Sequence, residues 1–239
     1  MTKMIIIITV FSASIFSALL ADDNSIWAGP TRDNIYTETN LADSWPEDGP
    51  ELLWQFDSLG IGYSAVAVNS SGVYVTGMKS DRTGHLYAFN HDGSIKWTIP
   101  YGSEWHRGFP GTRSTPVIYE GLMYFESAQG VVFCIKPENG EIVWSKDLMN
   151  DYGGVNIQYG LSESILVDDD RVICTPGGSE HNLMALNRLT GEVIWTNSAK
   201  GEPPTYLTPS LIERNGSKFL VTMTSSSIMG IEFETGELL

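Results

Sequence analysis

A repeated segment of twelve or thirteen residues constrains this chain more than any other feature. Each copy has one apolar run before a glycine turn and one after it. In the first three copies, a tryptophan follows four positions after the glycine. The copies occupy residues 86–97, 132–144, 183–195 and 228–239, with turn glycines Gly93, Gly140, Gly191 and Gly236. These glycines are 47, 51 and 45 residues apart. That period predicts tandem units of four strands each.

The glycine and the tryptophan have separate structural roles in the repeat. A glycine at positive φ between two apolar runs lets a tight hairpin follow the twist of its strands, so each copy is predicted to be the hairpin of two outer strands. The tryptophan at the end of the second run offers an apolar face that an isolated unit cannot bury. Neighbouring units are therefore expected to stack on one another.

A second series marks the innermost strand of each unit. It runs through residues 64–66, 115–117, 164–166 and 208–210, and a polar turn follows each member. No segment of the chain has helical periodicity over ten or more residues. We therefore predict an all-β fold, a β-propeller of four-stranded blades, with an opening strand around residues 52–54. Such a ring closes with about seven or eight blades, so the four predicted here are expected to be part of a longer gene product. The alternative is that another chain supplies the remaining blades.

The first residues have the pattern of an export signal. An apolar run from Met4 to Leu20 follows Lys3 and ends at Ala21 before polar residues. We assign residues 1–21 to a signal peptide, 22–51 to an N-terminal segment and 52–239 to the propeller, cut at its C-terminal side. The protein is expected to be periplasmic or extracellular, with no membrane span after cleavage at Ala21. An uncleaved anchor is the alternative. Its net charge of −15 disfavours nucleic acid as a partner.

The two cysteines lie in apolar, strand-like runs. Cys134 follows Val131-Val-Phe and Cys174 follows Val172-Ile. A free cysteine in such a run behaves as a small buried hydrophobic residue, and this is the reading we favour. A disulfide between them is the alternative, which an oxidising compartment would permit.

The repeat resembles a known family. The run Thr190-Gly-Glu-Val-Ile-Trp195 resembles the pyrroloquinoline-quinone (PQQ) enzyme repeat, and residues 27–54 are similar to the start of secreted bacterial PQQ-like propellers. The resemblance implies a quinoprotein-like propeller but not a single function. Dehydrogenases of this superfamily use PQQ with calcium, a catalytic aspartate and, in many members, a disulfide between adjacent cysteines. BamB-like members bind partner proteins without a cofactor. The present chain has no adjacent cysteine pair.

Candidate site residues lie in the loops that precede the inner strands, since these loops form the rim of a propeller's central funnel. Arg113 stands two residues before Thr115, and Tyr206 is at the matching place in the fourth unit. Glu163 lies next to that place in the third. Arg113 is suited to gripping a carboxylate or carbonyl. Its structural alternative is a pair with Glu163 or with backbone carbonyls.

Two further candidates share the segment 104–113. His106 beside Glu104 is a possible acid–base pair or metal ligand. No other histidine has zinc-site spacing, so no metal site is predicted. The acidic run at residues 168–170 is interpreted as a solvated turn, because it lacks the glycine and glutamate of a calcium loop.

Three functions fit these observations. The favoured one is a non-catalytic exported scaffold that binds a protein or a small molecule at its funnel and needs no cofactor. The alternative is a PQQ- and calcium-dependent dehydrogenase acting on an alcohol or sugar, with Arg113 and Glu163 near the quinone. The third is a glycan-binding or hydrolytic propeller with paired carboxylates. No catalytic residue can be assigned from spacing, because catalytic sets are defined by geometry.

Overall fold

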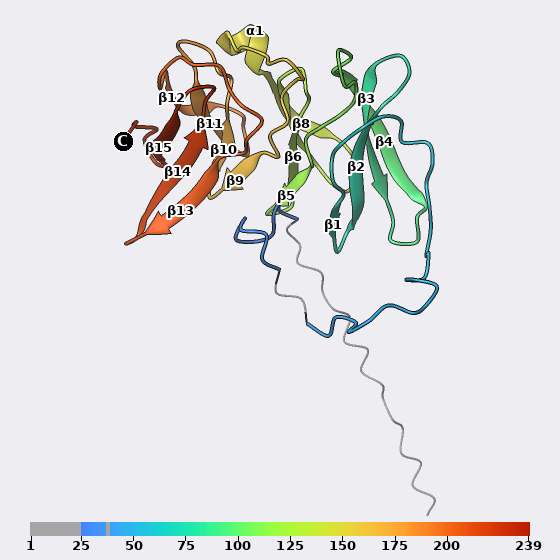
Figure 1. The fold of residues 1–239 in the computed structure, drawn as a ribbon. Coiled ribbons are helices and arrows are strands. Elements are labelled where there is room, and N and C mark those ends of the chain that lie inside the picture. The colour runs from blue at the N-terminus through green and yellow to red at the C-terminus, as the bar shows by residue number, and fades with distance from the viewer. Residues whose placement is uncertain (1–24, 37–38) are drawn as a thin grey trace, which may run out of the picture.

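The computed structural model describes residues 25–36 and 39–239, which form a row of antiparallel sheets (Figure 1). The predicted signal peptide lies outside the described residues. Three sheets have four strands and the last has three, and strands that are consecutive in sequence are neighbours in every sheet. Each sheet corresponds to one predicted unit, so the all-β fold of four-stranded blades is confirmed. The first four of these strands are β1 (Ala67–Asn69), β2 (Gly72–Met78), β3 (Thr83–Phe89) and β4 (Ile95–Ser103).

The remaining blades follow the same order. Blade 2 comprises β5 (Val117–Tyr119), β6 (Leu122–Glu126), β7 (Val131–Ile135) and β8 (Ile142–Asp147). Blade 3 comprises β9 (Leu166–Asp168), β10 (Arg171–Cys174), β11 (Leu183–Asn187) and β12 (Val193–Asn197), and blade 4 comprises β13 (Ser210–Arg214), β14 (Ser217–Met223) and β15 (Ile228–Glu232). A short helix, α1 (Leu148–Tyr152), follows β8. The side chain of Asp147 caps its start, and Gly153 in the left-handed region ends it.

The repeated tryptophan joins each blade to the next. The indole of Trp144, for example, lies over Gly191, where an added Cβ would meet it at 2.8 Å. Its Nε1 donates a hydrogen bond of 2.9 Å to the carbonyl of Arg188 in the following blade. Trp97 and Trp195 repeat both contacts, donating to the carbonyls of Pro137 and Phe233. The glycine is thus needed for the close approach of the indole as well as for its φ of +70°.

The expected opening strand at residues 52–54 is not a strand in the structure. Residues 51–56 have no ladder partner in the part of the chain that the structure describes. Trp54 nevertheless packs over Gly93 and donates from Nε1 to the carbonyl of His91 at 2.9 Å. It occupies on blade 1 the place that the repeated tryptophans occupy on the later blades. The apolar pattern therefore predicted its packing, but a strand also needs a neighbouring strand to bond.

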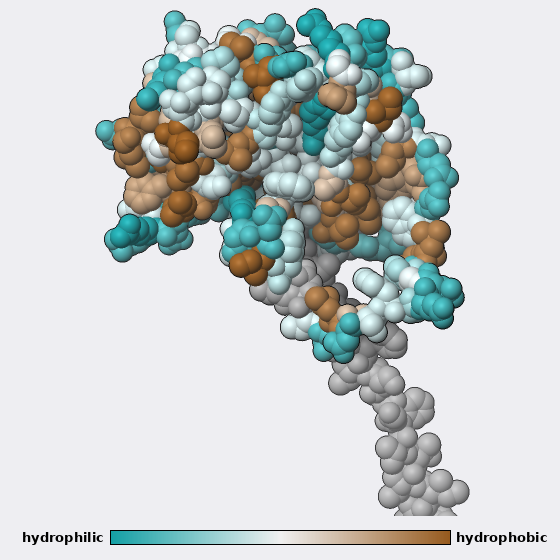
Figure 2. Space-filling model, in the orientation of Figure 1, coloured by the Kyte–Doolittle hydropathy of each residue, from teal (hydrophilic) through white to brown (hydrophobic). Residues whose placement is uncertain are grey.

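The blades are held together by apolar cores between them. One cluster joins blades 2 and 3 and includes both cysteines, Trp144 and Leu148. Cys134 and Cys174 are fully buried and free, as the favoured sequence reading predicted. Blade 4 presents apolar residues on its outer face, which Figure 2 shows gathered where Figure 1 places β13 to β15. Ile228 is 72% exposed there.

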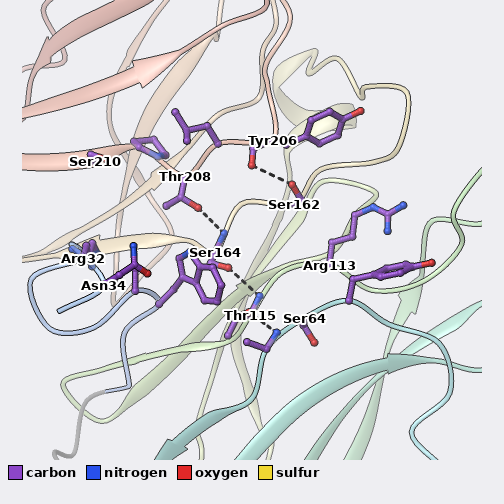
Figure 3. Close-up of a pocket in the computed structure, with 16 residues that line it drawn as sticks. Arg32, Asn34, Ser64, Arg113, Thr115, Ser162, Ser164, Tyr206, Thr208 and Ser210 are labelled. Carbon is purple, nitrogen blue, oxygen red and sulfur yellow. Dashed lines mark hydrogen bonds between the residues drawn. The ribbon is translucent and has the colours of Figure 1, made fainter. Parts of the chain in front are cut away.

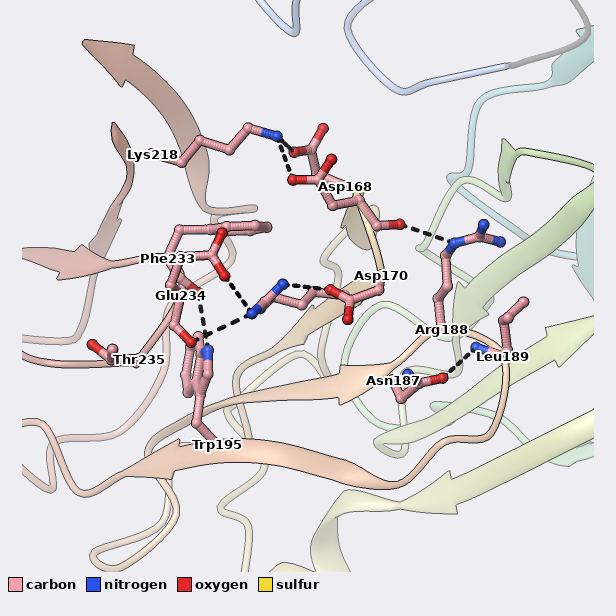
Figure 4. A network of polar contacts seen from close by, with 12 residues as sticks. Asp168, Asp170, Asn187, Arg188, Leu189, Trp195, Lys218, Phe233, Glu234 and Thr235 are labelled. Atoms are coloured by element: carbon pink, nitrogen blue, oxygen red, sulfur yellow. Dashed lines mark hydrogen bonds and ion pairs between the residues drawn. The ribbon is translucent and has the colours of Figure 1, made fainter. Parts of the chain in front are cut away.

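Charged side chains join the blades at the turns that follow the inner strands (Figure 4). Lys218 of blade 4 pairs with Asp168 and, at 2.7 Å, with Asp169 of blade 3. Arg171 of blade 3 pairs with Glu234 of blade 4 at 2.5 Å. The sequence suggested that the acidic run at residues 168–170 is a solvated turn. In the structure it is a turn whose aspartates form ion pairs with the next blade.

Candidate functional site

The inner strands converge on a cavity of about 510 Å³ (Figure 3). Its walls come from all four blades and from the N-terminal segment. The lining residues are Trp27, Ala28, Arg32, Asn34, Tyr63, Ser64, Ala65, Arg113, Thr115, Ser162, Ser164, Tyr206, Leu207, Thr208, Pro209 and Ser210. This is the central funnel that the sequence predicted, and its rim is formed by the loops that precede the inner strands.

A chain of hydroxyl contacts holds the inner strands around this cavity. The backbone N–H of Ala65 donates to Thr115 Oγ1 at 2.9 Å, and that of Thr115 donates to Ser164 Oγ at 3.2 Å. The N–H of Ser164 then donates to Thr208 Oγ1 at 2.9 Å. Figure 3 shows these links passing from blade to blade. The hydroxyl of the recurring serine or threonine therefore accepts a hydrogen bond from a backbone N–H at the start of the inner strand in the preceding blade. Without it, that N–H would lack an acceptor.

The N-terminal segment forms the floor of the cavity. Ser25 exchanges two backbone hydrogen bonds with Ile118 of β5, at 3.0 and 2.8 Å. Arg32 donates from Nη2 to the carbonyl of Val167 in β9 at 2.5 Å. Burial lowers the pKa of Arg32, and the negative charge of Asp168 opposes that shift. Sequence reasoning missed this role, since nothing in residues 25–36 shows which strands they contact.

Arg113 lies at the end of the cavity opposite the floor, and two backbone carbonyls hold its guanidinium. Nε donates to the carbonyl of Tyr159 and Nη2 to the carbonyl of Phe109. The guanidinium carbon lies 5.3 Å from the ring centroid of Tyr63. The sequence suggested two structural partners for Arg113 as the alternative to a ligand, namely Glu163 and backbone carbonyls. The structure shows the backbone carbonyls, and Arg113 and Glu163 form no ion pair.

Four aromatic rings surround Arg113 and, with it and Ser162, form what we call the mouth of the funnel: Tyr63, Phe109, Arg113, Tyr159, Ser162 and Tyr206. The rings of Tyr159 and Tyr206 stack with centroids 6.2 Å apart, and Phe109 meets Tyr159 edge-on at 5.6 Å. Phe109 and Tyr63 are 62% and 59% exposed. Only Arg113 and Tyr206 of this group were singled out from the sequence, because the other aromatics belong to no repeat.

Glu104 and Glu163 line neither the cavity nor the mouth. Glu104 accepts hydrogen bonds from the hydroxyl of Tyr101 at 2.7 Å and from the N–H groups of Trp105 and Ala128, both at 3.1 Å. Burial raises the pKa of this carboxyl, and the three donors oppose the rise. Its geometry is that of a loop anchor behind the mouth.

Glu163 is buried beside a second acid that the sequence did not reveal. It is 2% exposed, and its Oε2 has no hydrogen-bond partner among the described residues. Burial raises its pKa to about 8. Glu126, 4% exposed at the end of β6, has its pKa raised by burial and then by the charges of Glu163 and Glu104. The two carboxyls are thus kept protonated more readily than in water.

His106 lies in a neighbouring pocket of about 410 Å³, away from the funnel. This pocket is lined by Trp105, His106, Arg107, Gln129, Asn156, Ile157 and Gln158. The ring Nδ1 of His106 lies 3.4 Å from the carbonyl of Glu104, and the Glu104 carboxylate bonds other partners. The structure therefore does not form an acid–base pair from these two side chains.

The PQQ and calcium of the dehydrogenases would need oxygen ligands for the metal ion. In many members, an adjacent cysteine pair also packs on the quinone. In residues 25–36 and 39–239, no group of three His, Cys, Asp or Glu side chains is close enough to hold a metal ion. Among the described residues that line the cavity and the mouth, none carries a carboxylate side chain. The cysteines are buried separately in strands of blades 2 and 3. The residues described here do not fit that cofactor pair.

Comparison with known proteins extends over most of the chain. Residues 41–147 and 82–239 match the family described as "Outer membrane protein assembly factor BamB". The protein of that name from Kangiella koreensis is 30% identical over 138 residues, which are 56% of this chain and 31% of that relative. The matched region is therefore under a third of the relative's length.

Solved structures share the fold at low sequence identity. BamB from Moraxella catarrhalis superposes with a TM-score of 0.51 at 16% identity, covering 80% of this chain and 55% of that one. A europium-containing methanol dehydrogenase gives 0.55 at 14%, covering 79% and 43%. The quinohemoprotein alcohol dehydrogenase of Comamonas testosteroni gives 0.53 at 14%, covering 76% and 35%. These likenesses establish the propeller architecture alone.

Proposed function

Since the chain belongs to the family of the outer membrane protein assembly factor BamB, we propose that it is a non-catalytic, exported propeller that binds a protein partner through the mouth of its funnel. The observation that carries the proposal is the mouth itself. Exposed aromatic rings around a fixed arginine are the composition typical of protein-binding surfaces, where tyrosine, phenylalanine and arginine are enriched.

Export is supported by the sequence pattern of residues 1–21. Within the described residues, no helix has the length and apolar character needed to cross a bilayer. The name of the relatives places them in outer-membrane protein assembly, which is a setting outside the cytoplasm. We propose the same compartment for this protein.

Site-specific photocrosslinking in the native cell tests this function. A photoreactive phenylalanine replaces Phe109 or Tyr206 in the mouth of the full-length protein, and the matched control replaces Asn215 on the exposed turn between β13 and β14. We expect light-dependent adducts with a protein from positions 109 and 206 but not from 215, recovered in the exported fraction. Equal adducts from all three positions, or none from the mouth, would contradict the proposal.

The dehydrogenase alternative has its own test. Titration of the full-length protein with PQQ and calcium, followed by tryptophan fluorescence, is expected to give no saturable change, because the mouth contains no carboxylate for calcium. Saturable binding that Arg113→Ala weakens would replace the scaffold proposal with a quinoprotein.

A further inference from the structure

The charge of the cavity is opposite to that of the chain. The protein has 29 acidic and 14 basic residues, yet the described residues that line the cavity and mouth include two arginines and no aspartate or glutamate. Arg32 on the floor is bound to the carbonyl of Val167, whereas Arg113 lines both the cavity and its mouth. A ligand that reaches the mouth therefore meets a local positive charge in a negative surface.

The geometry of Arg113 leaves part of its guanidinium available. The two carbonyl contacts use Nε and one hydrogen of Nη2, and no residue in 25–36 or 39–239 bonds to Nη1. Burial lowers the pKa of Arg113, and Tyr63, Glu104 and Tyr206 oppose that shift. Glu104 does not line the cavity or the mouth, and its carboxyl influences Arg113 through its charge. That carboxyl already accepts hydrogen bonds from Tyr101 and from two backbone N–H groups. A carboxylate is the group that best completes the shell of this guanidinium.

The surroundings of Arg113 define the rest of the ligand. The stacked rings of Tyr159 and Tyr206 and the exposed ring of Phe109 give an apolar surface beside the guanidinium. An apolar or aromatic side chain adjacent to the carboxylate would contact these rings. The funnel beyond is lined by hydroxyls of serine and threonine, which suit the peptide groups of an extended chain.

We propose that the mouth binds a polypeptide segment presenting a carboxylate beside an apolar side chain, with the carboxylate on Arg113 and the side chain against Tyr159 and Tyr206. This inference rests on the proposed function and names the chemistry of its partner. The carboxylate belongs to a chain end or to an acidic side chain. These two sources share the contacts, and the experiment separates them.

Fluorescence anisotropy with labelled hexapeptides tests the proposal on the full-length protein. One set ends in phenylalanine, tyrosine, tryptophan or leucine with a free carboxylate, and a second set has the same sequences with a terminal amide. A third set is amidated and carries an internal aspartate before the apolar residue. We expect binding by the first or third set and at least about tenfold weaker binding by the second, because a charge-assisted hydrogen bond is lost.

Matched variants locate the effect. Arg113→Gln is expected to weaken the preferred set about tenfold or more, whereas Arg214→Gln makes the same charge change on an exposed turn-end residue and is expected to leave binding unchanged. Arg113→Lys keeps the charge without the planar fork and is expected to fall between them, which covers the case in which the glutamine variant does not fold.

Three results would overturn the inference. They are equal binding of the amidated and carboxylate peptides, equal effects of Arg113→Gln and Arg214→Gln, and preference for a free aromatic carboxylate such as benzoate over every peptide. If the mouth crosslinks to a protein while the peptides show no carboxylate dependence, only this inference fails. If crosslinking also fails, the proposed function fails with it.

Discussion

At the turn end of the inner strands, charged side chains of neighbouring blades pair with one another. At the mouth, the described residues give Arg113 two backbone carbonyls and the ring of Tyr63 as partners, and no ion pair. Arg188 of blade 3 pairs with Glu120 of blade 2, and Lys218 of blade 4 pairs with two aspartates of blade 3. The mouth loops also differ from blade to blade, while the turn glycines repeat. Contacts between blades therefore stabilise the turn end of the inner strands. At the mouth, the guanidinium of Arg113 still has donors that can bind a ligand.

Substitution of a repeated tryptophan tests the stabilising part of this comparison and has the largest expected effect. Trp144→Ala removes an indole that is 8% exposed and bonded to the next blade. We expect the free energy of unfolding to fall by about 3–5 kcal/mol, as for other buried tryptophans, measured by urea denaturation. Trp45→Ala, at a site 70% exposed, is the control and should change it by less than about 0.5 kcal/mol. Similar losses at both sites would remove the role assigned to stacking.

The buried acid Glu163 predicts a pH dependence of stability. An unfolded glutamate ionises near pH 4.3, whereas burial holds the pKa of Glu163 at about 8 in the folded protein. The folded state therefore keeps a proton that the unfolded state releases, and stability should fall as pH rises from about 4.5 to about 8. The slope is at most about 1.4 kcal/mol per pH unit for this group.

Glu163→Gln should flatten that slope, measured by urea denaturation at several pH values. The matched control is Glu213→Gln on β13, an exposed strand position. A variant that keeps the full wild-type slope would show that Glu163 ionises without cost in its buried place. Glu126 is expected to leave a residual slope of the same sign, because burial raises its pKa as well.

The turn glycines give a smaller effect with a close internal control. Gly191→Ala places a methyl at φ +70° and 2.8 Å from the indole of Trp144. Gly121→Ala has a similar φ of +78° but nothing within 4 Å. We expect Gly121→Ala to cost about 1 kcal/mol from backbone strain alone and Gly191→Ala to cost about 1 kcal/mol more. Thermal unfolding of both variants measures the difference, and equal costs would show that the indole moves aside freely.

The ion pairs at the turn end have the smallest expected effect. Lys218→Gln removes the contacts to Asp168 and Asp169, which are 19% and 55% exposed at their side chains. We expect a loss of about 0.5–1 kcal/mol that shrinks in high salt, because partly exposed pairs are screened. Lys200→Gln on an exposed loop is the control. A loss that is independent of salt would point to packing of the lysine stem instead of charge.

Several features of the structure were predictable from the sequence because they depend on neighbours along the chain. The hairpins at Gly93, Gly140 and Gly191 and the burial of both cysteines follow from local apolar patterns and glycine conformation. The position of Arg113 at the rim followed from counting back from the inner-strand motif. Those arguments need only local apolar patterns, glycine conformation and the period of the repeat.

Other features were decided by tertiary contacts between residues far apart in sequence. Ser25 bonds the N-terminal segment to β5, and Arg32 on the funnel floor bonds to β9. Glu126 lies buried beside Glu163, and Trp54 packs on blade 1 without a strand. The sequence by itself determined the blades, since strand and turn preferences act over a few residues. Only the tertiary structure decided which side chains share the funnel and which acids are buried, because these depend on how blades some fifty residues apart are stacked.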